Sequence, residues 1–150
     1  MSRIAGRFQQ LAVQGRTALI PYIVAGDPSQ DITVPLMHRM VESGADIIEI
    51  GVPFSDPMSE GPVIQQGHER ALANGMCLSR VLELVQEFRT SDDTTPLLLM
   101  GYANPVMHMG YAAFADAASA AGLDALLTVD IPPEEVDDIN AQLQRVGIDN

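Results

Sequence analysis

Residues 44–53 read Gly-Ala-Asp-Ile-Ile-Glu-Ile-Gly-Val-Pro, and this segment indicates most clearly how the 150-residue chain folds. Its central part, 46–51, is a nearly continuous apolar run of strand length that begins after Gly44 and ends at Gly51. Such runs are typical of strands in parallel sheets that helices cover. The segment therefore predicts an inner strand of an α/β protein.

Strand and helix patterns alternate on both sides of this segment. An N-terminal helix with Ile4, Phe8 and Leu11 on one face is followed by strands expected at 18–24, 46–51, 96–100 and 124–129. Helices are expected at 31–43, 63–74, 78–90 and 111–121, and at a last segment that Pro132 and Pro133 open, with loops at 52–62 and 101–109. Four successive strand–helix units predict a parallel sheet with right-handed crossovers.

An internal repeat favours a barrel over an open, doubly wound sheet. Residues 44–46 and 122–124 are Gly-Ala-Asp and Gly-Leu-Asp, and each triplet precedes a strand and then a proline. Repetition of this kind is expected of a (βα)8 TIM barrel, which typically needs about 250 residues. We therefore expect residues 1–150 to form one domain, the N-terminal half of such a barrel and the first part of a longer protein. A half-barrel that dimerises through its free edges is the alternative.

Composition excludes several classes of function. The chain has 8 basic and 20 acidic residues, a net charge of −12, so nucleic-acid binding is not expected. All the basic residues are arginine, which excludes Schiff-base lysine chemistry and a P-loop lysine within this chain. No apolar run approaches a membrane span, and the single Cys77 fits a reducing cytoplasm. The three histidines, His38, His68 and His108, lack metal-ligand spacing, so no metal site is predicted and core or surface roles are expected for them.

Candidate chemistry collects where the strands end, which is where parallel α/β folds bind ligands. Glu49 interrupts an apolar strand, and burial among apolar neighbours would raise its pKa toward the range of a general acid or base, although a structural, paired carboxylate is the alternative. Asp56 and Glu60 lie in a proline-rich loop that is either a lid, a docking surface or a solvated segment. Tyr22 and Tyr102 could line an apolar pocket or pack in the core.

Several motifs together resemble the α subunits of tryptophan synthase along the whole chain. They are Pro-Tyr-Ile-Val-Ala-Gly-Asp-Pro at 21–28, Glu-Ile-Gly-Val-Pro-Phe-Ser-Asp-Pro at 49–57, Gly-Pro-Val-Ile-Gln at 61–65 and Tyr-Ala-Asn-Pro at 102–105. The resemblance implies a (βα)8 barrel that cleaves indole-3-glycerol phosphate to indole and glyceraldehyde 3-phosphate. It also implies an α2β2 complex in which the β subunit holds pyridoxal phosphate and receives the indole, while the α subunit has no cofactor.

The same resemblance assigns roles to single residues. Glu49 corresponds to the family's catalytic acid/base, and Glu60 takes the place of a second catalytic acid, which is usually an aspartate and therefore one methylene shorter. Substrate-binding positions are Tyr22, Tyr102 and Leu127, and positions that meet the β subunit are Pro53, Asp56, Asn104, Asp130 and Pro132. Asp130 could equally be a strand-end cap.

Two departures from the family limit what the chain is expected to do. The longer Glu60 side chain predicts reduced or altered activity unless the loop compensates, because a displacement of about 1 Å can cost on the order of 100-fold in rate. The family's phosphate-binding residues come from its second half, so the 150-residue chain alone is expected to cleave negligibly. A non-catalytic half-barrel that serves in assembly or binding is the alternative function.

Overall fold

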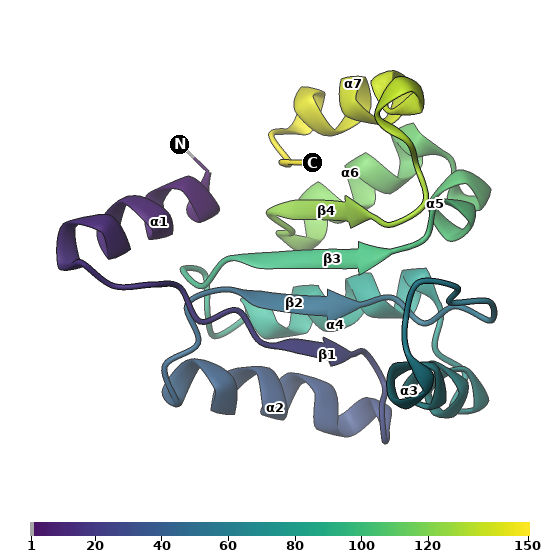
Figure 1. Cartoon of the computed structure of the whole chain (residues 1–150), viewed down its shortest axis with the longest axis horizontal. Coiled ribbons are helices and arrows are strands. Elements are labelled where there is room, and N and C mark those ends of the chain that lie inside the picture. The colour runs from purple at the N-terminus through teal and green to yellow at the C-terminus, as the bar shows by residue number, and fades with distance from the viewer. Residues whose placement is uncertain (1) are drawn as a thin grey trace.

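A four-stranded parallel sheet forms the centre of the computed structural model, which describes residues 2–150 (Figure 1). The strands are β1 (Tyr22–Val24), β2 (Ile48–Gly51), β3 (Leu97–Gly101) and β4 (Ala125–Thr128), and they lie side by side in that order. Each crossover thus leads to the next strand in the same direction, as in the wall of a barrel. The predicted parallel sheet and the strand–helix alternation are confirmed.

The helices lie mainly along the strands, with exceptions at the two ends of the sheet. Helices α2 (Gln30–Glu42), α4 (Leu78–Arg89) and α6 (Tyr111–Ala121) belong to the crossovers between the strands, and α7 (Asp137–Val146) follows β4. Helix α1 (Arg3–Gln14) lies beyond the amino-terminal ends of the strands, whereas α3 (Pro62–Ala73) and α5 (Ala103–Met109) lie toward the carboxyl ends (Figure 1). No helix within residues 2–150 is long and apolar enough to cross a membrane.

Three expectations about these elements were wrong in detail. The first strand is shorter than 18–24, because only Tyr22–Val24 pairs regularly with β2. Residues 101–109 are not all loop but contain α5, whose first amide, at Ala103, donates to the distant Asp130 carboxylate at 2.7 Å. Pro132 does not open a helix: it precedes a second proline, which favours extended backbone, and a 3-10 turn η1 (Pro133–Glu135) comes before α7.

The two faces of the sheet differ in cover. Ile48, Ile50, Leu97, Leu99 and Leu126 are at most 2% exposed and pack in one apolar core with residues of the helices. The register puts Tyr22, Glu49, Leu98 and Ala125 in one row on the opposite face. On that face Leu127 of β4 is 45% exposed. This open face corresponds to the interior of a barrel, and it carries the acid that the sequence singled out.

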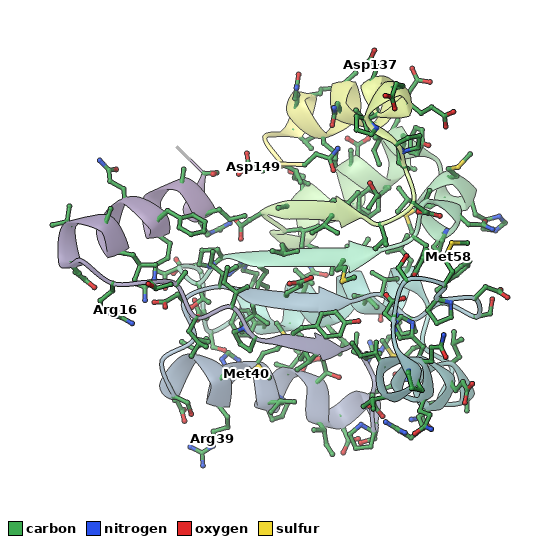
Figure 2. All side chains as sticks on the ribbon, viewed as in Figure 1. Arg16, Arg39, Met40, Met58, Asp137 and Asp149 are labelled. Carbon is green, nitrogen blue, oxygen red and sulfur yellow. The ribbon has the colours of Figure 1, made fainter. Side chains whose placement is uncertain are left out.

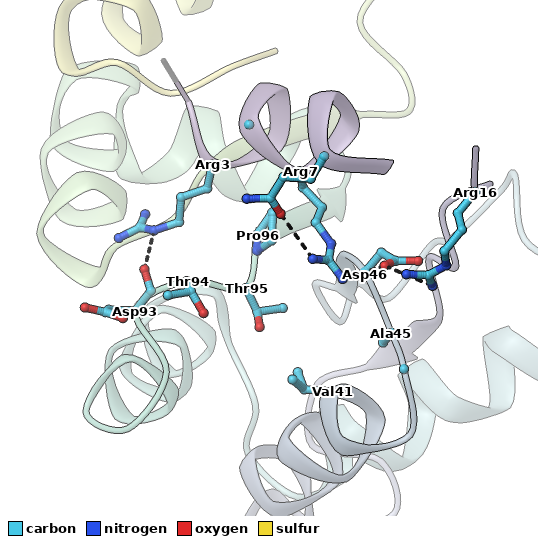
Figure 3. A pocket seen from close by; sticks show the side chains of 13 residues that line it. Arg3, Arg7, Arg16, Val41, Ala45, Asp46, Asp93, Thr94, Thr95 and Pro96 are labelled. Atoms are coloured by element: carbon cyan, nitrogen blue, oxygen red, sulfur yellow. Dashed lines mark hydrogen bonds and ion pairs between the residues drawn. The ribbon is translucent and has the colours of Figure 1, made fainter. Parts of the chain in front are cut away.

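Buried carboxylates attach α1 to the amino-terminal end of the sheet. Asp46 accepts a hydrogen bond from Arg7 at 2.6 Å, and Arg16 lies 3.6 Å away (Figure 3). The Leu19 amide donates a further hydrogen bond to Asp46 at 2.8 Å. Beside them a cavity of about 620 Å³ separates α1 from the segment that precedes β3. The predicted apolar face of α1 is only partly buried, since Leu11 is 2% exposed but Phe8 is 48% exposed.

Candidate active site

Glu49 lies on β2, on the open face of the sheet and between the buried Ile48 and Ile50. Its side chain is half-buried, and among residues 2–150 its carboxylate forms no ion pair and accepts no hydrogen bond. Burial raises the pKa of the Glu49 carboxyl above its ordinary value. The alternative of a paired structural carboxylate therefore finds no support, and the group is suited to hold and release a proton.

Glu60 is held by Tyr102, which follows β3. The Tyr102 hydroxyl donates a hydrogen bond to the Glu60 carboxylate and accepts one from the Ser59 amide at 2.9 Å. The Tyr102 ring is 1% exposed and stacks on Phe54 with 5.0 Å between the ring centroids. Burial and the bond to Glu60 raise the pKa of the Tyr102 hydroxyl. The loop between β2 and α3 is thus folded back onto β3 and carries its acid to a defined place.

Tyr22 reaches over Gly51 on the open face. A Cβ atom placed on Gly51 would lie 2.1 Å from the Tyr22 hydroxyl oxygen, so the glycine makes room for the phenol. The hydroxyl is 3.4 Å from Nε2 of His68 on α3. Burial first, then the negative charges of Glu60 and Glu49, raise the pKa of the Tyr22 hydroxyl. The strand register pairs Tyr22 with Glu49 on the neighbouring strand.

His68 belongs to this cluster, although the sequence predicted only a core or surface role for it. The residue is 2% exposed, and its Nδ1 accepts a hydrogen bond from the Phe54 amide at 3.0 Å. Burial lowers the pKa of the imidazole, an effect that the charge of Glu60 opposes. One sequence feature could have indicated that His68 faces inward: it lies on the same side of α3 as Ile64 and Ala71, which pack against or in the core.

The structure therefore brings together four of the predicted catalytic and substrate-binding residues, Glu49, Glu60, Tyr22 and Tyr102, and adds His68. Leu127, the fifth, lies on the same face but on β4 and exposes 45% of its surface. Acids beside phenols on an otherwise apolar face can exchange protons with an aromatic ligand and hold its polar atoms. Within residues 2–150 no group of three or more potential ligands could hold a metal ion.

The residues expected to meet a partner lie around the same carboxyl edge of the sheet. Asp56, Asn104, Asp130 and Pro132 are exposed, whereas Pro53 is buried. The Asp130 carboxylate accepts the hydrogen bond of the Ala103 amide and so caps helix α5, rather than acting as the strand-end cap considered for it.

Exposed apolar side chains accompany this edge and were not singled out from the sequence. Met58 and Val63 are both 79% exposed, and Met107 is 60% exposed. Met58 lies on the side toward which the strands point (Figure 2). The sequence could have indicated Met58, because it is an apolar residue in a proline-rich loop and such loops usually expose polar residues.

Comparisons with known proteins identify a family. The family pattern described as "Tryptophan synthase alpha chain" matches residues 8–150. The tryptophan synthase alpha chain of Laribacter hongkongensis is 61% identical over 148 residues, which are 99% of this chain and 56% of that protein. The alpha chain of Thioalkalivibrio sulfidiphilus is also 61% identical, over 149 residues and with the same coverage.

Solved structures agree with this result. The tryptophan synthase subunit alpha of Legionella pneumophila superposes with a TM-score of 0.97 at 49% identity, over 99% of this chain and 56% of that chain. A structure described as the tryptophan synthase α2β2 complex of Pyrococcus furiosus matches with a TM-score of 0.82 at 39% identity, over 87% of this chain and 53% of its own. The chain spans about half the length of the relatives that it matches, and its fold is a partial (βα)8 barrel. It belongs to the tryptophan synthase alpha chain family.

Proposed function

We propose that these residues form the acid-bearing half of an enzyme that cleaves indole-3-glycerol phosphate to indole and glyceraldehyde 3-phosphate. The observation that carries the proposal is the unpaired, half-buried Glu49 on the open face of the sheet, with a pKa raised by burial. Membership of the family and the resemblance of the motifs support the choice of substrate. We also propose that the enzyme works in the cytoplasm, without a cofactor of its own.

The cleavage needs only one proton carrier and an electron sink within the substrate. Protonated Glu49 gives its proton to C3 of the indole ring, which becomes an indoleninium ion. The resulting carboxylate removes the proton of the hydroxyl on the adjacent side-chain carbon. That carbon becomes the aldehyde of glyceraldehyde 3-phosphate, the carbon–carbon bond breaks, and its electrons return to the ring. The raised pKa of Glu49 supports this cycle, since the group must begin protonated and end protonated.

Glu60 would stabilise the positive charge at the ring nitrogen. The side chain of Glu60 is longer than the family's usual aspartate, so a misplaced charge was expected. The Tyr102 hydroxyl, which donates to Glu60 and accepts from the Ser59 amide, would compensate by fixing the position of the Glu60 carboxylate. Tyr22 on β1, Tyr102 directly after β3 and Leu127 on β4 would border the indole ring.

The carboxyl edge would be the surface for a tryptophan synthase β subunit in an α2β2 assembly, the subunit that holds pyridoxal phosphate and accepts indole. Exposed apolar side chains beside polar ones are the composition of protein interfaces, and Met58, Met107 and Asn104 provide it here. The Pyrococcus furiosus α2β2 structure supports this proposal by its similarity to the present chain.

The decisive experiment uses a chimera in which residues 1–150 are continued by the C-terminal part of the Laribacter hongkongensis relative. Indole release from indole-3-glycerol phosphate is measured for the chimera, for Glu49→Gln and for Glu87→Gln, a matched change on the exposed side of α4. We expect Glu49→Gln to lose on the order of 100-fold or more in kcat, the usual contribution of a general acid/base, and Glu87→Gln to stay at the parent rate. An active Glu49→Gln chimera contradicts the assignment.

The chain without such a continuation has a second candidate function, a non-catalytic assembly or binding module. The open face with Leu127 at 45% exposure favours it, because an uncovered apolar face invites association. Size-exclusion mass measurement tests this role. A stable dimer or a stable complex with a β subunit supports it, whereas a monomer that releases indole rapidly contradicts it.

A further inference from the structure

The buried His68 makes two contacts that fix its protonation. Its Nδ1 lies 3.0 Å from the Phe54 amide nitrogen, and because an N–H can only donate, Nδ1 must accept and carries no proton. The ring is 2% exposed, and its burial favours the neutral form. A neutral ring with a bare Nδ1 carries its proton on Nε2, the atom that faces Tyr22 at 3.4 Å.

This assignment sets the direction of the neighbouring hydroxyl. Since Nε2–H donates to the Tyr22 oxygen, the hydrogen of that hydroxyl must point away from the His68 ring. Tyr22 stands on the open face of the sheet, in register with Glu49 of β2, and the charges of Glu60 and Glu49 both act on it. The hydroxyl hydrogen therefore points away from His68 of α3, on the open face where Glu49 lies and a substrate would bind.

We propose that His68 is a positioning residue with two tasks: it holds the loop between β2 and α3 through Phe54, and it orients the Tyr22 hydroxyl as a hydrogen-bond donor toward the substrate. The role of the second task in cleavage rests on the proposed function. The first task, and the tautomer on which both depend, are properties of the chain itself.

The two contacts can be separated by conservative substitutions. In His68→Asn the side-chain oxygen lies near the place of Nδ1, so the bond from Phe54 is kept and the contact with Tyr22 is lost. In His68→Gln the amide nitrogen lies near the place of Nε2, so the contact with Tyr22 is kept and the bond from Phe54 is lost. If His68 only filled space, the two substitutions would not differ in which of the two contacts they remove.

Measurements on the 150-residue chain test the contacts without any activity. Nitrogen-15 NMR of the imidazole should show the neutral tautomer with the proton on Nε2. Exchange of the Phe54 amide should accelerate about tenfold in His68→Gln and stay unchanged in His68→Asn, as expected when one hydrogen bond is lost. A proton on Nδ1, or equal exchange in both variants, overturns the proposal.

Kinetics of the chimera with the Laribacter hongkongensis C-terminal part test the orienting task. His68→Asn and Tyr22→Phe should each lose about tenfold in kcat/KM, and the double variant should lose no more than either, because both remove the same contact. In the His68→Gln background, where the contact with Tyr22 is kept, Tyr22→Phe should still cost about tenfold in kcat/KM. Losses of His68→Asn and Tyr22→Phe that multiply to about 100-fold in the double variant, or a fully active His68→Asn, overturn the proposal. An inactive parent chimera instead contradicts the proposed function, while the NMR result still decides the tautomer.

Discussion

Gly51 is where the smallest change in sequence should displace a residue of the site. An added Cβ would lie 2.1 Å from the Tyr22 hydroxyl oxygen, 2.6 Å from Cζ and 3.0 Å from Cε2. An ordinary contact begins at 3.4 Å, so Gly51→Ala requires the phenol to move by about 1.3 Å, which is the difference between 3.4 and 2.1 Å. The ring cannot move this far and keep its contact with His68, which is already 3.4 Å long.

The expected effect has two measurable parts. Forcing a methyl group into a filled position should lower the free energy of unfolding by about 1–3 kcal/mol. In the chimera with the Laribacter hongkongensis C-terminal part, a displacement of this size should lower kcat/KM on the order of 100-fold. Urea unfolding monitored by circular dichroism and indole release measure the two quantities.

Two controls make the result interpretable. Gly6→Ala adds the same methyl group on α1, where nothing lies within 4 Å, and should raise the free energy of unfolding by about 0.5–1 kcal/mol. In a Tyr22→Ala background, which lacks the obstructing ring, Gly51→Ala should lower the free energy of unfolding much less than it does in the parent. A Gly51→Ala protein with parental stability and an unchanged Tyr22 environment by NMR would refute the reasoning.

Three further changes test other parts of the structure. Glu60→Asp in the chimera should bring no gain and lose about tenfold in activity, since the shorter acid leaves the hydroxyl of Tyr102; a gain would show that the extra methylene misplaces the charge. Asp124→Asn should cost about 3–5 kcal/mol in urea unfolding, because a buried arginine loses its partner, whereas Asp116→Asn in an exposed pair should cost less than about 1 kcal/mol. Because burial raises the pKa of Glu49, its protonation stabilises the fold at pH values below the ordinary pKa of 4.5, and this contribution is lost as the pH rises through the raised pKa. The free energy of unfolding of the parent should therefore fall relative to that of Glu49→Gln between pH 4 and pH 7. Parallel plots of unfolding free energy against pH for the two proteins would contradict the shift.

Tertiary contacts account for the features that sequence patterns missed. Residues 101–109 were expected to be a loop, yet they contain helix α5, whose first amide is capped by Asp130, 27 residues away. His68 belongs to no recognisable sequence motif, and its role depends on contacts with Phe54 and Tyr22, which come from other segments of the chain. No local pattern records such pairs.

The sequence by itself determined the order of the four strands, the parallel sheet and the position of Glu49 within β2, because apolar periodicity and turn residues are local properties of the chain. It also determined the family, since the motifs around residues 49–57 are specific. Only the tertiary structure decided which face of β2 stays open, that Tyr102 holds Glu60, and that His68 joins the site. The physical reason is that the free energy of a buried polar group depends on partners that the fold brings from distant segments.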